Sequence, residues 1–156
     1  VEKEKGKTKG DSQTKRAKPP CRYDITIDNR SGSPLEGIRI EYCMYVVTDF
    51  SDGRNDELKV VNGAINGIKL GVRGQKSMQT KQVELYRYYD RQIERTYDSY
   101  GGYDTTTSYN KTKEEVLVGI CVRVYMKTKK GNEFMRDIYE PSSLKGKYQW
   151  EPPSGI

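Results

Sequence analysis

The residues best suited to chemistry in this sequence are aromatic and cationic, and they gather in one stretch. Seven of the thirteen tyrosines lie between Tyr86 and Tyr109, with Arg87, Arg91 and Arg95 among them. Tyr offers a large contact area with few rotatable bonds and Arg adds directional donors, a composition typical of recognition surfaces for proteins, sugars or bases. Ordinary strand and loop residues are the alternative. The stretch predicts a binding surface formed by Tyr88, Tyr89, Arg91, Arg95, Tyr97, Tyr100, Tyr103 and Tyr109.

Residue types that enzymes commonly use are missing from the sequence. The chain contains no histidine, which removes the commonest general base and transition-metal ligand and excludes Ser-His and Cys-His nucleophilic sites. The three cysteines form no C-x-x-C pair, so they predict no closed zinc site. The glycines at 63, 67, 71 and 74 lack the context of a phosphate-binding loop. We therefore expect a non-enzymatic protein with no cofactor and no bound metal.

One acidic cluster leaves a cation site open as an alternative. Asp49, Asp52, Asp56 and Glu57 fall in one polar stretch, and carboxylate oxygens are the ligands that Ca²⁺ prefers. Their spacing matches no calcium-binding loop. A solvated acidic turn is the simpler interpretation.

The cysteine count bears on the redox compartment. Three is an odd number, so at least one thiol stays free or pairs outside the chain. Cys43 and Cys121 fall in two separate predicted strands, and Cys21 lies at the entrance of the first strand. A disulfide between Cys43 and Cys121 is one interpretation for an exported protein, and free thiols are the other.

Most of the net charge of +6 belongs to the start of the chain. Residues 1–18 hold seven basic and three acidic residues, which gives +4 and leaves +2 for the rest. A basic tail on a nearly neutral body predicts a disordered Lys-rich lead, or tether, over residues 1–20. Binding of this lead to an anionic polymer is the alternative. No run of 18 apolar residues predicts a membrane span.

Alternating apolar residues predict strands along most of the remaining chain. Arg22–Asn29 alternates strictly, and in residues 38–48 the predicted core face is opposed by an outward face that carries Arg39, Glu41, Cys43 and Tyr45. A shorter strand is predicted at Leu58–Val61, before hairpin signals at Asn62-Gly63 and Asn66-Gly67. The predicted core face of residues 38–48 consists of Ile38, Ile40, Tyr42, Met44 and Val46.

The second half of the chain predicts two long strands around an irregular segment. Lys76–Tyr89 is predicted as one strand with a bulge near Lys81, because its apolar residues change phase there. Residues 90–111 show no apolar periodicity and predict a long excursion between strands. Val116–Met126 then gives an unbroken inward row typical of a central strand, which a turn at 128–132 joins to Phe134–Tyr139.

Together these patterns predict an all-β protein, a single antiparallel β-sandwich of about seven strands over residues 21–150, followed by a tail at 151–156. In strand number and spacing, residues 22–139 resemble immunoglobulin-like and fibronectin-III-like domains. Trp150 departs from the Cys, Trp, Cys order of antibody domains. With its tethered lead, the chain also resembles small bacterial surface proteins associated with pilus-type systems.

Three functions are consistent with this reading. The first is a secreted, periplasmic or outer-surface interaction module of a bacterium, which contacts a protein or glycan partner through the Tyr/Arg-rich loop. The second is a structural subunit of an envelope or pilus-like assembly that self-associates through strand edges. The third is anionic polymer binding through the lead, although the small charge of the body makes a nucleic-acid partner the weakest expectation.

Overall fold

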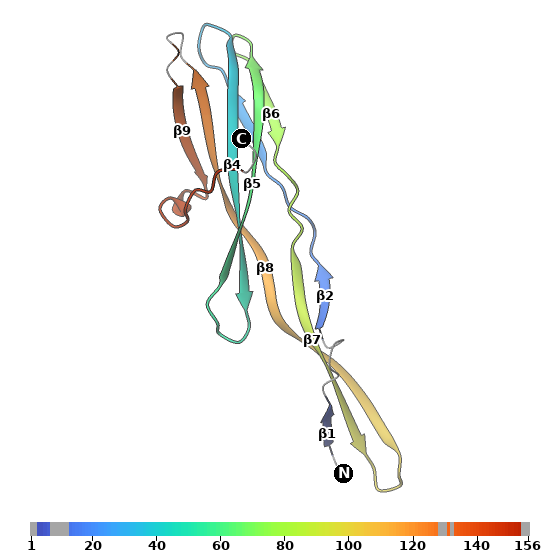
Figure 1. Cartoon of the computed structure of the whole chain (residues 1–156). Helices are drawn as coiled ribbons and strands as arrows, with labels where there is room; N and C mark the ends of the chain where they lie inside the picture. Colours follow the sequence, from blue (N-terminus) through green and yellow to red (C-terminus); the bar gives the residue numbers. More distant parts are fainter. Residues whose placement is uncertain (1–2, 7–12, 128–130, 132, 154–156) are drawn as a thin grey trace. The chain divides into compact units, whose positions relative to one another are not determined.

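The computed structural model describes residues 3–6, 13–127, 131 and 133–153, and their regular structure is almost entirely β (Figure 1). Among these residues the one helical turn is η1, a 3-10 helix at Ser142–Leu144. The predicted all-β class and antiparallel pairing are therefore confirmed. The strands are β1 Lys3–Gly6, β2 Gln13–Ala17, β3 Asp24–Asp28, β4 Leu35–Phe50, β5 Glu57–Leu70, β6 Gln75–Gln79, β7 Tyr86–Tyr97, β8 Tyr103–Lys127 and β9 Glu133–Glu140.

The chain divides into two compact units, where one domain was expected over residues 21–150. Unit 1 consists of Val1–Pro19, Thr48–Glu57 and Glu84–Val116. Unit 2 consists of Pro20–Val47, Leu58–Val83 and Leu117–Ile156. Strands β4 and β8 contribute residues to both units, so the division falls within strands rather than at a linker. No change of composition marks it in the sequence for that reason.

The inner face of β4 forms the hydrophobic core of unit 2. Its alternate residues are all buried, which confirms the predicted core face: Ile38, Ile40, Tyr42, Met44 and Val46. Ile68 and Leu70 of β5 and Ile120 and Val122 of β8 are buried as well. In the large sheet β4 lies between β5 and β8, and β9 pairs with β8. This arrangement gives β4 a neighbour on each side, as a central strand requires.

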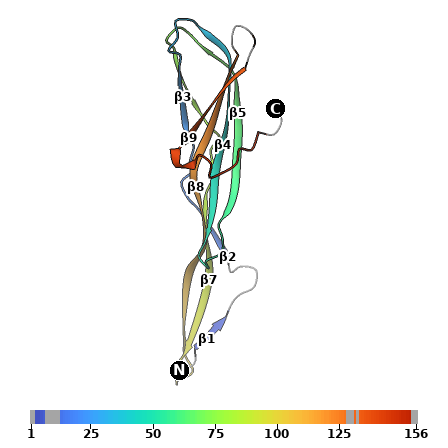
Figure 2. The ribbon, with the colours of Figure 1, turned by 90° about the vertical axis from the view of Figure 1, so that its left-hand side faces the viewer.

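A second, two-stranded sheet lies over part of this core. It consists of β3 and β6, which pair from Asp24 opposite Gln79 to Asp28 opposite Gln75. Figure 2 shows β3 on one side of the strands of unit 2 and β5 on the other. A cleft of about 390 Å³ is lined by β3 residues and by residues of β4, β5, β8 and β9, so the β3 layer covers the inner face incompletely. A two-layer β architecture results, compatible with the predicted sandwich.

The opposite face of β4, predicted to point outward to solvent, is also buried. Cys43 and Tyr45 are 0% and 1% exposed. They are covered by residues 142–153, which we call the C-terminal strap. The Tyr45 hydroxyl donates to the carbonyl oxygen of Gln149 at 3.0 Å, and its ring stacks on Tyr148 with 4.9 Å between ring centroids. The prediction was wrong because it placed no element after the strand that ends near Pro141 and gave the aromatic residues of the strap no partner.

Cys43 and Cys121 lie beneath this strap as free thiols. Cys43 and Cys121 belong to the neighbouring strands β4 and β8 and share one buried cluster with Tyr45 and Leu144. The Cys43 thiol donates to the carbonyl oxygen of Glu151 at 3.0 Å, and desolvation by burial raises the pKa of both thiols. The structure thus shows the free-thiol alternative. The two residues are lateral neighbours in one sheet and do not face each other between two sheets.

Two strand boundaries differ from the sequence predictions. The hairpins predicted at Asn62-Gly63 and Asn66-Gly67 are absent, because β5 runs through both pairs. Gly63 meets a packing need instead, since a Cβ there would lie 2.4 Å from the Tyr42 hydroxyl oxygen. The strand predicted at Lys76–Tyr89 is interrupted, because β6 ends at Gln79 and β7 begins at Tyr86. The change of apolar phase marked this break and not a bulge.

Part of the predicted disordered lead is paired with β7. In β2, Gln13–Ala17 lies antiparallel to β7, from Gln13 opposite Asp90 to Ala17 opposite Tyr86. β1 pairs with the following part of β7, from Gly6 opposite Ile93 to Lys3 opposite Thr96. The remaining residues of the lead before Gln13 lie outside the described residues. Within residues 13–17 the lead is therefore an edge strand.

Candidate functional site

The segment predicted as an irregular excursion is a hairpin formed by β7 and the first half of β8. Residues pair from Arg87 opposite Glu114 to Tyr97 opposite Tyr103. Asp98 closes the turn, because its Oδ1 accepts hydrogen bonds from the backbone amides of Tyr100 and Gly102, both at 2.9 Å. The excursion prediction for residues 90–111 is therefore wrong, and the predicted site residues lie on two strands and their turn.

The hairpin contains one irregularity, which falls inside the predicted site. Tyr88 lies opposite Lys113, and the next residue, Tyr89, lies opposite Lys111. Thr112 is thus an extra residue on β8, as in a β-bulge. Its hydroxyl donates to the Tyr88 carbonyl oxygen at 3.2 Å. The alternation of side chains on β8 changes phase at this residue.

Beyond the bulge, six of the eight predicted residues share one face of the hairpin. Side chains of opposed and alternate residues point to the same face. Arg91 lies opposite Tyr109, and Tyr97 opposite Tyr103. We call this surface the Tyr/Arg face: Tyr89, Arg91, Arg95, Tyr97, Tyr103 and Tyr109. Tyr100 lies in the turn, and Tyr88, which precedes the bulge, alternates to the opposite face.

The other face of the hairpin has a different chemistry. Its β7 residues are Asp90, Gln92, Glu94 and Thr96, and its β8 residues are Asp104, Thr106, Ser108 and Asn110. This alternation of Tyr, Arg and Ile with acidic and polar residues was visible in the sequence between residues 89 and 97. The prediction missed it because only apolar residues were counted as one face.

Cations stack against the tyrosines of the Tyr/Arg face. The guanidinium carbon of Arg16, on β2, lies 4.8 Å from the ring centroid of Tyr89 and 5.2 Å from that of Tyr109. Arg95 lies over Tyr103 at 5.7 Å. Such contacts stabilise an exposed pair by about 0.5–1 kcal/mol. Arg16 belongs to the basic lead, so the lead contributes a residue that sequence reasoning did not assign to the site.

The Tyr/Arg face and the turn are partly open to solvent. Tyr103 is 58% and Tyr109 46% exposed, and Tyr100 in the turn is 95% exposed, whereas Tyr89, Arg91 and Tyr97 are half-buried. Of the hydrophobic residues described in unit 1, Phe50 and Leu85 are the buried ones. A two-stranded ribbon without a covered apolar face is marginally stable in water by itself. The hairpin thus holds large aromatic side chains that a folding core does not use.

An ionic cluster secures the root of the hairpin. The Arg87 guanidinium donates to Glu114, and the ammonium groups of Lys18 and Lys111 each lie 3.6 Å from a carboxylate oxygen of Glu114. The hydrogen bond from Arg87, together with the charges of the two lysines, lowers the pKa of the Glu114 carboxyl group below its ordinary value. This carboxylate joins β8 to both β7 and the lead.

We expect the Glu114 cluster to make the free energy of unfolding fall as the pH is lowered. A carboxyl group with a lowered folded-state pKa contributes stability above its unfolded pKa of about 4.3, and this contribution is lost as the pH falls through the folded value. Glu114→Gln should therefore lose less stability than the unmodified chain between pH 6 and pH 3, measured as the shift of the urea midpoint. Glu36→Gln, at an exposed position, serves as control. An unchanged pH dependence in Glu114→Gln would contradict the assignment.

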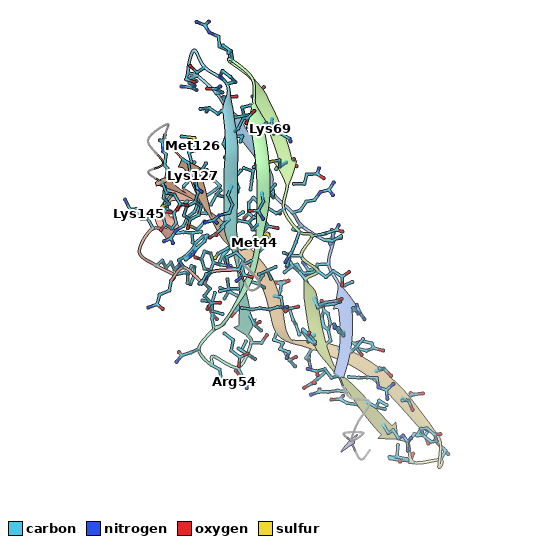
Figure 3. All side chains as sticks on the ribbon, turned by 45° about the horizontal axis from the view of Figure 1, so that its top comes forward. Met44, Arg54, Lys69, Met126, Lys127 and Lys145 are labelled. Carbon is cyan, nitrogen blue, oxygen red and sulfur yellow. The ribbon has the colours of Figure 1, made fainter. Side chains whose placement is uncertain are left out.

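Two of the acidic residues considered for calcium, Asp52 and Glu57, line a separate hollow in unit 1. Asp52 accepts a hydrogen bond at 2.7 Å from Arg54, which Figure 3 shows in the β4–β5 loop. This hollow of about 610 Å³ carries both charge signs, with Arg54, Lys111 and Lys113 beside Asp52, Glu57 and Asp90. Among the described residues no group of three His, Cys, Asp or Glu side chains lies close enough to hold a metal ion.

Comparison with known proteins gives no relative. No family model, no curated protein and no solved structure matches this chain. In the part of the chain that the structure describes, no helix has the length and apolar character needed to cross a membrane.

Proposed function

We propose that this protein is a non-enzymatic interaction module that binds a protein or glycan partner through the Tyr/Arg face and the Tyr100 turn. The observation that carries the proposal is the high exposure of Tyr100, Tyr103 and Tyr109 on a hairpin of paired strands. Tyrosine and arginine are enriched among residues that dominate binding energy at interfaces. A site on paired strands also positions them more precisely than the loop expected from the sequence.

The lead supports this assignment over anionic polymer binding. Arg16 stacks on Tyr89 and Tyr109, and Lys18 contacts Glu114 and donates to the Glu115 carbonyl oxygen at 2.9 Å. These basic side chains are engaged within unit 1. The proposal includes an immunoglobulin-like topology and a periplasmic or outer-surface location in a bacterium, which the pattern resemblance favours. Determining the coding sequence upstream of Val1 would test the location, because the proposal expects it to encode a signal peptide.

The test replaces the three exposed tyrosines together. A glycan array and a panel of purified surface proteins are probed with the unmodified chain, and each hit is measured again with the Tyr100→Ser, Tyr103→Ser, Tyr109→Ser variant. We expect at least a tenfold loss of affinity, because interface hot spots contribute about 2 kcal/mol or more each and about 1.4 kcal/mol corresponds to a factor of ten.

A matched control separates this surface from general exposed hydrophobicity. Leu58, Val72 and Ile138 are 46%, 53% and 51% exposed and belong to unit 2. Changing these three to serine should leave the affinity for the same hits within a factor of about two, because surface changes away from a hot spot alter binding little. Equal loss in both triple variants, or retained binding in the tyrosine variant, would refute the proposed surface.

A further inference from the structure

In the part of the chain that the structure describes, one edge of the hairpin has no strand beside it. The outer edge of β7 is paired with β1 and β2. On the other side β8 neighbours β4, and just after the end of β4 the Ser51 amide donates to the Thr112 carbonyl oxygen at 2.9 Å. For Tyr103–Asn110, no strand among the described residues pairs with the edge that faces away from β7. Figure 1 shows this gold part of β8 at the margin of the hairpin.

The composition of this edge favours the addition of another strand. Exposed edges in soluble proteins are usually protected by lysine, proline, a bulge or a covering segment. Tyr103–Asn110 contains neither lysine nor proline, carries one charge at Asp104, and is rich in threonine and tyrosine, which favour strands. The bulge at Thr112 lies outside the segment. The edge therefore offers unpaired backbone donors and acceptors along a regular strand.

We propose that the occupant of this edge is the same edge of a second copy of the chain, paired antiparallel about Thr106. The inference rests on the proposed function in that both use the hairpin, but here the partner is named. A two-fold axis perpendicular to the sheet keeps each face on its own side, so opposed residues must come from the same face. This condition leaves only registers in which residues of equal parity lie opposite each other.

Centring the pair on Thr106 is the register in which the exposed tyrosines match. Tyr103 of each copy then lies opposite Tyr109 of the other, on the Tyr/Arg face, and aromatic cross-strand pairs stabilise sheets. On the polar face Asp104 lies opposite Ser108, so no like charges meet. Two side chains that are 58% and 46% exposed in one copy become covered at both ends of the interface. The Tyr/Arg faces of the two copies join into one continuous surface.

The first test is concentration-dependent assembly of the full chain. Because the contact is a single short edge, smaller than the roughly 1,200 Å² of a stable interface, we expect a weak dimer that analytical ultracentrifugation detects at concentrations up to about 1 mM. A strict monomer over that range would overturn the inference. The proposed function would stand, since binding of a different partner through the tyrosines does not require the dimer.

Charge reversal at the two-fold axis tests the register. Thr106→Lys puts two ammonium groups directly opposite each other and should abolish the dimer, as should Thr106→Glu, whereas an equimolar mixture of the two variants should form a heterodimer. Gln92→Lys adds the same charge to the same face of β7, away from the edge, and should leave dimerisation unchanged. Persistence of the Thr106→Lys dimer would overturn the interface.

A third variant should strengthen the assembly. Ser108→Lys brings an ammonium group opposite Asp104 of the other copy, twice per dimer, and should lower the dissociation constant severalfold at low salt. Loss of the dimer in this variant would overturn the register centred on Thr106. Thr106 and Ser108 lie on the polar face, so these variants leave the Tyr/Arg face available for binding a partner. Failure of the dimer and failure of the proposed function are thereby distinguishable.

Discussion

Replacing Ile120 by alanine is expected to lower the free energy of unfolding by about 2–5 kcal/mol, the usual cost of removing a buried branched side chain and leaving a cavity. Ile120 is 3% exposed on β8 and belongs to the core of unit 2. Because proteins of this size are stable by about 5–15 kcal/mol, such a loss should shift the denaturant midpoint strongly. Chemical denaturation followed by far-ultraviolet circular dichroism measures it.

Two further variants test what decides the loss of free energy of unfolding: the burial of a side chain, or its place in the inward row predicted for Val116–Met126. Ile138→Ala removes the same atoms from a side chain that is 51% exposed, and Val116→Ala changes a residue of the predicted inward row that is 38% exposed. Each should cost less than about 1 kcal/mol. If Val116→Ala were as destabilising as Ile120→Ala, the uniform inward row would be correct and the described burial would not.

The C-terminal strap depends on a position where no side chain fits. A Cβ at Gly119 would lie 2.1 Å from Leu144 Cδ1 and 2.6 Å from the Glu140 carbonyl oxygen. We expect Gly119→Ala to lower the free energy of unfolding by about 1–3 kcal/mol, because overpacking forces backbone shifts. Trp150, the only tryptophan of the chain, lies in the strap with Arg123 over its ring at 4.2 Å. Its emission should shift to longer wavelength as the strap detaches.

Gly32→Ala is the matched control for this change, since a Cβ at Gly32 would meet no atom within 4 Å. It should stay within about 0.5 kcal/mol of the unmodified chain and leave the tryptophan emission unchanged. A Gly119→Ala chain with an unaltered midpoint and emission would show that the strap does not rest on this residue.

Apolar alternation predicted strands that include Asp24–Asp28, most of Leu35–Phe50 and most of Glu133–Glu140, and it predicted the core face of β4. It failed on the opposite face of β4, at Cys43 and Tyr45, because polar neighbours beneath the strap conceal burial. The turn signal at Asn62-Gly63 failed as well, because Gly63 gives space to the ring of Tyr42 within β5.

For the candidate site, the residue types were informative and their grouping was not. Composition identified the tyrosines and arginines, whereas the register of the hairpin, with Arg91 opposite Tyr109 and Tyr97 opposite Tyr103, decides which residues of β8 share a face with Tyr89. Register, like the bulge at Thr112, depends on pairing between strands and leaves little trace in one sequence. Arg16 joined the site through β2, a contact that only the tertiary structure brings about.

The bulge at Thr112 makes the hairpin tolerant of losing a residue there and intolerant of gaining one further along β8. Without Thr112, Lys113 would still lie opposite Tyr88 and Lys111 opposite Tyr89, so regular alternation would keep Tyr103 and Tyr109 on the Tyr/Arg face. One residue inserted between Tyr109 and Lys111 would instead turn both tyrosines toward the acidic side of β7 and bring the threonines round in their place. Spacing along β8 therefore governs which side chains a partner meets as strongly as their identity does.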